Sequence, residues 1–181
     1  MRSRYQARLC VIILTLIGAS LFAGCGSENP ANNATTANTA PVSDLPYASA
    51  PLPDNGYRAT ITLPEPPTKL RAGQKVVIQV KAQNASDVPW KVRGGGADNK
   101  FYIAVGDRWL KPNGTLITSM DGRSGLNRNL KPGEETEVPL QITAPQEPGE
   151  YMLEVDLVQE QVAWFHDKGS ATAKTKITVV K

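Results

Sequence analysis

The one compact group of side chains that could do acid/base chemistry is Glu160, His166 and Asp167. An imidazole beside carboxylates can move protons, so hydrolysis through Glu160 and His166 is one hypothesis. Hydrolysis would also need an oriented nucleophile or two carboxylates at a set spacing, and the sequence has no Gly-x-Ser-x-Gly elbow. We therefore expect no enzyme activity and no catalytic residue, and hydrolysis stays a distant alternative.

The sequence has few of the residues that usually bind metals or cofactors. The chain has one histidine and two cysteines among 181 residues, too few for a zinc site built from those ligands. The three glycines at 94–96 are followed by neither Gly-Lys-Ser/Thr nor a predicted helix, unlike a phosphate-binding loop. We expect no metal and no cofactor.

The charge distribution argues against another class of partner. The formal net charge is +3, and Arg2, Arg4 and Arg8 supply three of the 20 basic residues. The remaining 17 equal the 17 acidic residues, so the body of the chain is neutral. Nucleic-acid binding needs a basic face that offsets phosphate, and we therefore expect no nucleic-acid partner.

Residues 1–24 have the features of a signal peptide. Positive charges lie within residues 1–8, and an uncharged, mostly apolar run covers residues 9–23. This run of about 15 residues is shorter than the roughly 20 that span a bilayer. A charged start, a short apolar run and small residues at its end are typical of a secretory signal.

Residues 21–25, Leu-Phe-Ala-Gly-Cys, resemble the lipobox of bacterial lipoproteins, although Phe22 stands where that family usually has leucine. The resemblance implies that Cys25 becomes the N-terminus and carries fatty acyl chains, so membrane lipid is an expected partner. Several acyl chains anchor a protein stably. We expect a lipid-anchored envelope protein outside the cytoplasm, on the outer membrane where the cell has one. A plain secretory peptide and an uncleaved anchor are the alternatives.

The composition changes after the cysteine and again near residue 57. Residues 25–56 are mostly Ala, Asn, Thr, Ser and Pro and hold few large apolar side chains. Such a segment buries too little surface to offset the entropy of ordering, so we expect a disordered tether over 25–56. Residues 57–181 are expected to form one domain.

The domain is built from short runs with apolar residues at every second position. Pro and Gly signals separate these runs, and no stretch has a capped helical period. This pattern predicts an all-β fold, an immunoglobulin-like antiparallel β-sandwich of about seven or eight strands. The runs lie at 58–63, 75–84, 101–105, 116–118, 136–142, 151–157 and 173–180.

Two positions in the domain carry further expectations. Strict alternation after Val105 would turn Asp107 inward, where an unpartnered carboxylate is costly. We expect a bulge at Gly106 and Asp107, or else a partner for Asp107. Tyr151 follows Pro148-Gly149 and is expected to be a corner tyrosine that ties a loop to the sandwich.

The C-terminal half carries a more specific pattern. It comprises Ala-Pro at 144–145, Pro-Gly-Glu-Tyr at 148–151 and Leu-Glu-Val-Asp-Leu-Val-Gln-Glu-Gln-Val-Ala-Trp-Phe at 153–165. The pattern resembles an immunoglobulin-like domain appended to bacterial glycosyltransferases. It is also similar to the C-terminal carbohydrate-binding domain of O-antigen ABC transporters. The likeness covers about residues 60–180 and implies the fold and, more weakly, sugar binding. Gln161 stands where the family usually has Gly, and Asp107 where it often has an aromatic residue.

We interpret the chain as a non-catalytic binding module for an envelope glycan or protein. Binding residues concentrate in loops on a rigid scaffold, here 85–100, 121–130 and 161–169. Core or edge packing is the more ordinary role for the three tryptophans, Trp90, Trp109 and Trp164. The alternative function is a structural subunit that docks through a sheet edge. The candidate ligand-binding residues are Trp90, Arg93, Asp98, Arg123, Trp164, Phe165 and His166.

Overall fold

The computed structural model describes residues 47–181, apart from the side chains of residues 119–121. The expected signal peptide, the acylation site at Cys25 and most of the expected tether lie outside the described residues. No helix within the described part is long and apolar enough to cross a membrane.

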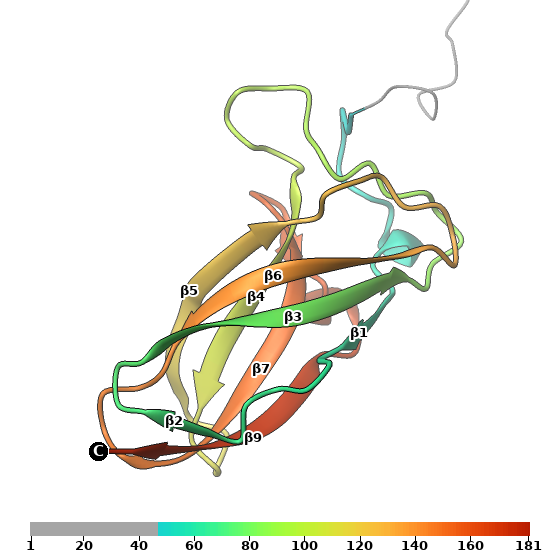
Figure 1. Cartoon of the computed structure of the whole chain (residues 1–181). Helices are drawn as coiled ribbons and strands as arrows, with labels where there is room; N and C mark the ends of the chain where they lie inside the picture. Colours follow the sequence, from blue (N-terminus) through green and yellow to red (C-terminus); the bar gives the residue numbers. More distant parts are fainter. Residues whose placement is uncertain (1–46) are drawn as a thin grey trace, which may run out of the picture. The chain divides into compact units, whose positions relative to one another are not determined.

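The domain is a sandwich of two β-sheets (Figure 1). The first sheet has the order β1-β3-β6, from β1 (Ala59–Thr62), β3 (Lys75–Asn84) and β6 (Glu135–Thr143). The second has the order β2-β9-β7-β4-β5, and β8 pairs with β7. Its strands are β2 (Lys69–Arg71), β4 (Ile103–Leu110), β5 (Leu116–Gly125), β7 (Gly149–Gln159), β8 (Ala163–Trp164) and β9 (Ala173–Val180).

The expected immunoglobulin-like β-sandwich is confirmed, with two differences. The described residues form nine strands rather than seven or eight, because β2 and β8 have only three and two residues. The pairing of β2 with β9 is parallel, whereas the other strand pairs are antiparallel.

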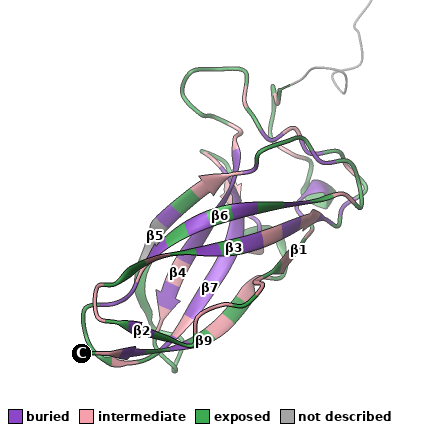
Figure 2. Ribbon diagram, in the orientation of Figure 1, coloured by how far each residue is buried: buried purple, intermediate pink, exposed green. Residues whose placement is uncertain are grey.

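Alternation of side chains builds the core between the sheets. In β6 every second residue is buried, and β3 shows the same period towards its end (Figure 2). The central strands β4 and β7 are buried along most of their length on both faces. Something must therefore cover the outer face of the second sheet as well.

Asp107 turns inward and has a partner, and the expected bulge lies on the neighbouring strand. Its pairing with Val155 of β7 is regular, whereas the register with β5 shifts between Gly106 and Arg108. The extra residues are on β5, where the backbone N–H of Gly122 donates to Asp107 Oδ1 at 2.6 Å. The expected bulge at Gly106 and Asp107 was thus placed on the wrong strand.

The domain begins earlier than the sequence suggested. Ala48 forms a bridge with Gly94, and the N–H of Leu52 donates to Gln159 Oε1 at 2.9 Å. A 3-10 turn, η2 (Asp54–Gly56), follows, and the carbonyl of its buried Gly56 accepts a hydrogen bond from Trp90 Nε1. Residues 47–56 are therefore packed against the sandwich and are not part of a disordered tether.

The expected corner tyrosine is confirmed. The hydroxyl of Tyr151 donates to the carbonyl of Glu147 at 2.9 Å and so ties the loop before β7 to the strand.

Candidate functional site

Small residues form a floor on the outer face of the second sheet. Gly106 of β4 lies opposite Arg123 of β5, and Gly125 of β5 lies opposite Ala104 of β4. A Cβ atom at Gly106 would collide with the guanidinium of Arg123 and the ring of Trp164. A Cβ atom at Gly125 would collide with the ring of Tyr102. Glycine in the strands lets these planar groups lie close to the sheet.

Tyr102, Arg123 and Trp164 together form what we call the planar platform. The guanidinium carbon of Arg123 lies 4.6 Å from the centroid of the Trp164 ring, within the range of a cation–π contact. Arg123 Nε is 3.2 Å from Glu160 Oε1, and this ion pair fixes the guanidinium over the ring. Trp164 is partly exposed, so the platform is open to a ligand.

Beside the platform lies a polar hollow of about 410 Å³. The predicted residues Arg93, Asp98 and Arg123 meet in its wall. Arg93 and Asp98 come from one loop, whereas Arg123 lies on β5, so the expected loop 121–130 is strand up to Gly125. Tyr102 and Arg123 belong to both the hollow and the platform. The other wall residues are Asn99, Gly125, Glu160 and Gln161.

The loops around the hollow hold residues in the left-handed backbone region. Asn99, Phe101 and Gln161 have φ values of 57°, 67° and 60°. They are three of the four non-glycine residues with positive φ in residues 47–181. Gln161 Nε2 donates to the carbonyl of Asp98 at 2.8 Å, and the Phe101 N–H donates to the carbonyl of Glu160 at 3.1 Å. Such backbone strain persists where surrounding contacts hold it and is concentrated at functional sites.

Gln161 stands where the resembled family usually has glycine, and its backbone conformation is one that suits glycine. Its positive φ is a conformation that glycine adopts without cost. The turn before Trp164 is therefore kept, and its side chain gains the contact to the 98–102 loop. The cost of the conformation is offset by that contact.

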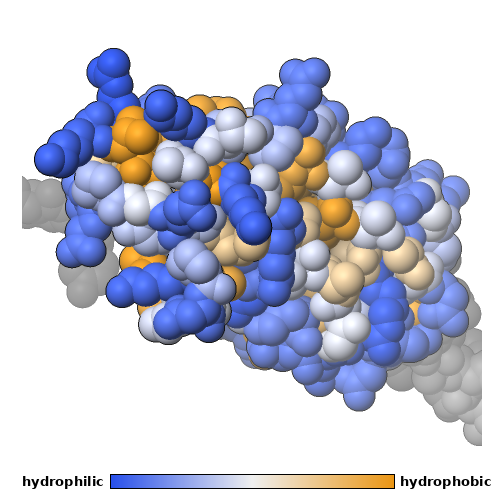
Figure 3. All heavy atoms as spheres, turned by 90° about the horizontal axis from the view of Figure 1, so that it is seen from below, coloured by the Kyte–Doolittle hydropathy of each residue, from blue (hydrophilic) through white to orange (hydrophobic). Residues whose placement is uncertain are grey.

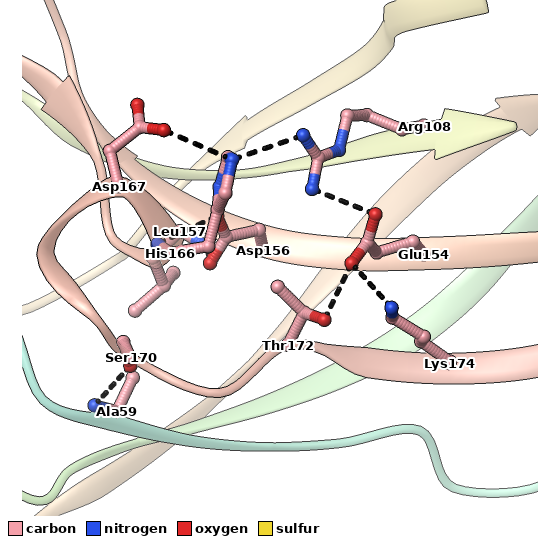
Figure 4. A network of polar contacts seen from close by, with 10 residues as sticks. All are labelled: Ala59, Arg108, Glu154, Asp156, Leu157, His166, Asp167, Ser170, Thr172 and Lys174. Carbon is pink, nitrogen blue, oxygen red and sulfur yellow. Dashed lines mark hydrogen bonds and ion pairs between the residues drawn. The ribbon is translucent and has the colours of Figure 1, made fainter. Parts of the chain in front are cut away.

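A network of buried charges covers the rest of the outer face (Figure 4). Asp156 on β7 is 1% exposed, and its Oδ2 lies 2.6 Å from His166 Nδ1. His166 starts the 3-10 turn η3 (His166–Lys168), and its Nε2 is 3.1 Å from Arg108 Nη1 and 3.2 Å from Asp167 Oδ1. Burial raises the pKa of Asp156, partly offset by the hydrogen bonds from His166 and from the Leu157 N–H.

Glu154, two residues earlier on the same face of β7, has stronger partners. Its carboxylate accepts from Arg108 Nη2 at 2.7 Å and from the Thr172 hydroxyl at 2.7 Å, and it lies 3.2 Å from Lys174 Nζ. Burial opposes its ionisation, but the hydrogen bonds from Thr172 and Lys174 and the charge of Arg108 outweigh burial and lower the pKa of Glu154. The pKa values of the two neighbouring carboxyl groups are thus shifted in opposite directions.

Two of the predicted ligand-binding residues are instead core residues. Trp90 and Phe165 are both fully buried, and their rings meet edge to face at 5.2 Å. Phe165 makes a second edge-to-face contact with Tyr57 at 5.1 Å. Neither side chain can reach a ligand outside the sandwich, and these two predictions were wrong. The alternative reading of Trp90 as a core residue is the correct one.

The two residues of the distant hydrolase hypothesis have separate partners. Glu160 is engaged with Arg123, and His166 is engaged with Asp156. Within residues 47–181, no group of three or more His, Cys, Asp or Glu side chains is arranged to hold a metal ion.

The sequence analysis missed Tyr102 and the glycine floor. The sequence analysis placed Tyr102 in the run 101–105, with apolar residues at every second position, and gave Gly106 only as part of a bulge. It assigned neither residue to a site. A signal was nevertheless present, because glycine inside a strand marks a place where another group approaches closely. Gly106 and Gly125 both carry that signal.

Comparison with known proteins adds solved structures of low similarity. No protein-family model matches the sequence, and neither does any curated protein sequence. The CARDB domain of PF1109 from Pyrococcus furiosus is 16% identical, with a TM-score of 0.41, over 67% of this chain and 94% of that one. The sporulation control protein Spo0M from Bacillus subtilis is 16% identical, with a TM-score of 0.42, over 68% of this chain and 49% of that one. A β-glucosidase from Listeria innocua, in complex with glucose, is 14% identical, with a TM-score of 0.41, and the match spans 68% of this chain but only 16% of the enzyme.

Proposed function

We propose that this chain is a non-catalytic binding module that holds an envelope glycan on the planar platform and is anchored to a membrane through acylated Cys25. The observation that carries the proposal is the platform itself. Tyr102, Arg123 and Trp164 lie close to a floor of glycines beside a polar hollow.

The chemistry of the platform suits a sugar. Binding sites combine aromatic surface with a few well-placed polar groups that fix orientation. Arg123 covers part of the Trp164 ring, and the apolar face of a sugar ring can rest on the part that stays exposed. The guanidinium of Arg123 and the carboxylate of Glu160, 3.2 Å apart, offer a donor and an acceptor for neighbouring hydroxyls.

The described chain enters the domain close to the hollow, which supports a ligand in the cell envelope. Ala48 pairs with Gly94, so the described chain starts beside the loop that forms the hollow (Figure 1). The C-terminus lies at the other end of the sandwich. Residues 26–46 separate Cys25 from this end of the domain, so an anchor at Cys25 would hold the hollow on the side of the membrane.

The test is binding of the full chain, purified in detergent, to an array of bacterial envelope oligosaccharides. Trp164→Ala should abolish binding, because the stacking surface is lost. Leu116→Ala is the matched control, since Leu116 is 53% exposed on β5 and lies outside the platform. Absence of any bound glycan, or equal binding by the Trp164→Ala variant, would overturn the proposal.

A second candidate function, docking of a protein along β5, has one specific observation behind it. Leu116 and Ile117 are 53% and 38% exposed at the start of this edge strand. Ile117 also lines a hollow of about 420 Å³ together with Pro145 and Tyr151. On the face seen in Figure 3, however, hydrophobic side chains lie in separate groups among hydrophilic ones. Leu116→Asp should release a docked partner that the Trp164→Ala variant retains.

A further inference from the structure

Two cations of the loop that borders the polar hollow differ from the other charges on this face of the molecule. Arg93 lines the hollow, and Lys100 lies in the same loop. Neither side chain has a carboxylate within ion-pair distance in the part of the chain that the structure describes. By contrast, Arg123 is paired with Glu160 and Arg108 with Glu154.

Aromatic rings hold both of these cations in place. The guanidinium carbon of Arg93 lies 5.7 Å from the centroid of the Tyr102 ring, and Lys100 Nζ lies 5.2 Å from that of Phe101. Contact with a ring leaves the N–H groups at the edge of a guanidinium free to donate. Arg93 is exposed, so these donors can be reached from solvent.

The nearest acidic residue of the loop is engaged with the backbone. Asp98 Oδ1 accepts the N–H of Lys100 at 3.1 Å, and the Asp98 carbonyl accepts from Gln161. The wall of the hollow holds two carboxylates, Asp98 and Glu160, beside two arginines. Glu160 is paired with Arg123, but Arg93 has no carboxylate within ion-pair distance among the described residues, so its guanidinium can pair with an anionic group of a ligand.

We propose that the ligand of the platform is an acidic glycan, whose anionic group is bound by Arg93 with Lys100 as a second cation. This inference rests on the proposed function. A carboxylate on a sugar ring, or a phosphate substituent, can accept two parallel hydrogen bonds from a guanidinium. With one ring of the glycan on Trp164, an acidic neighbour would lie over Tyr102 and meet Arg93.

The experiment compares three sets of probes on the full chain: oligomers of hexuronic acid, phosphorylated oligosaccharides and neutral oligosaccharides. Acidic probes should bind at least about tenfold more tightly than neutral ones, as expected for a charge-assisted bidentate contact. Arg93→Gln should remove that preference, and Lys100→Gln should weaken it. Chemical reduction of the carboxyl groups separates uronate recognition from phosphate recognition.

Arg71→Gln is the matched control, because Arg71 is an exposed arginine on β2, at the other end of the sandwich. Neutral glycans that bind as well as acidic ones, with no effect of Arg93→Gln, would overturn the inference and leave the proposed function standing. Failure of every glycan to bind would overturn both. An equal loss in the Arg71→Gln variant would show a general charge effect and so also contradict the role of Arg93.

Discussion

Trp164 and Phe165 are neighbours in the sequence but lie on opposite faces of the second sheet. Phe165 is fully buried between Tyr57 and Trp90, where ring edges meet ring faces. Trp164 is partly exposed and lies against the guanidinium of Arg123. Both are large aromatic residues, so the difference comes from what each face of the sheet offers. The inner face offers close packing, and the outer face offers charge.

The same contrast runs along β7. Leu153, Val155 and Leu157 point into the core, whereas Glu154 and Asp156 point outward and are nevertheless buried. His166 of η3 contacts Asp156, and Glu154 is held by Arg108 of β4, Lys174 of β9 and Thr172, which directly precedes β9. The outer face of the central strands is thus closed by a polar layer, which leaves the platform beside it rigid and accessible.

The largest effect is expected for the inner aromatic cluster. Trp90→Ala removes a fully buried ring and its hydrogen bond to the Gly56 carbonyl. Loss of such a side chain costs about 3 to 5 kcal/mol of unfolding free energy, through lost burial and the cavity left behind. Chemical denaturation measures this directly. A loss below about 1 kcal/mol would contradict the assignment of Trp90 to the core.

The polar layer should make stability depend on pH in a way that Glu154 controls. The pKa of Glu154 is lowered in the folded state, so its contribution is present above the ordinary pKa of a glutamate and is lost as the pH falls through the lowered value. Glu154→Gln should cost about 2 kcal/mol at neutral pH and flatten this part of the acid unfolding profile. Denaturation measured at several pH values checks both effects.

Asp156 is the control, because its pKa is shifted in the opposite direction to that of Glu154. Its pKa is raised by burial, so ionisation costs stability at neutral pH, and this cost disappears as the pH falls through the raised value. Asp156→Asn should therefore be less costly at neutral pH than Glu154→Gln, provided that His166 keeps its hydrogen bond. A larger loss of unfolding free energy in Asp156→Asn than in Glu154→Gln would contradict the opposite pKa shifts of the two carboxyl groups.

Much of the fold could be predicted because it depends on local alternation. The period of two in β6 and β7 assigned the inward residues of both strands correctly. Alternation could not separate Trp164 from Phe165, because Phe165 lies past the end of β8 and caps η3, and the sequence analysis assigned both to the ligand. It failed for Trp90, which forms only an isolated bridge to Leu130, outside the named strands. The position of Trp90 is set by contacts with residues 34 and 75 positions away, Gly56 and Phe165, which no local pattern encodes.

The site could be predicted only in part, for a related reason. Arg93, Asp98 and Arg123 were found because charged residues are visible in a sequence, and the fold brings them into one hollow, although Arg123 lies on β5 and not on the expected loop. The platform depends on Gly106 and Gly125 lying under side chains from other segments. That arrangement depends on the register of β4 against β5, which contains the shift opposite Asp107.

A smaller effect on stability, but a large one on binding, is expected from filling the glycine floor. Gly106→Ala keeps a backbone that any residue can adopt, but its methyl group displaces the Arg123 guanidinium and the Trp164 ring. We expect a cost of about 1 to 2 kcal/mol from overpacking, together with loss of glycan binding. Gly133→Ala is not a matched control, because Gly133 has φ of 82°. Ala104 is a natural methyl group on the same floor, and Ala104→Gly is the control that should leave binding intact, because it adds no atom beneath Arg123 or Trp164.

The smallest effect on stability is expected for Trp164 itself. Its ring is partly exposed, and truncation to alanine removes a cation–π contact with Arg123 that is worth about 0.5 to 1 kcal/mol at such a site. The Trp164→Ala variant should therefore unfold within about 1 kcal/mol of the parent while losing its ligand, whereas Trp90→Ala loses several times more stability. Denaturation of the two variants side by side measures the difference. Equal losses would show that the outer ring is structural, and the platform would then have no separate role in binding.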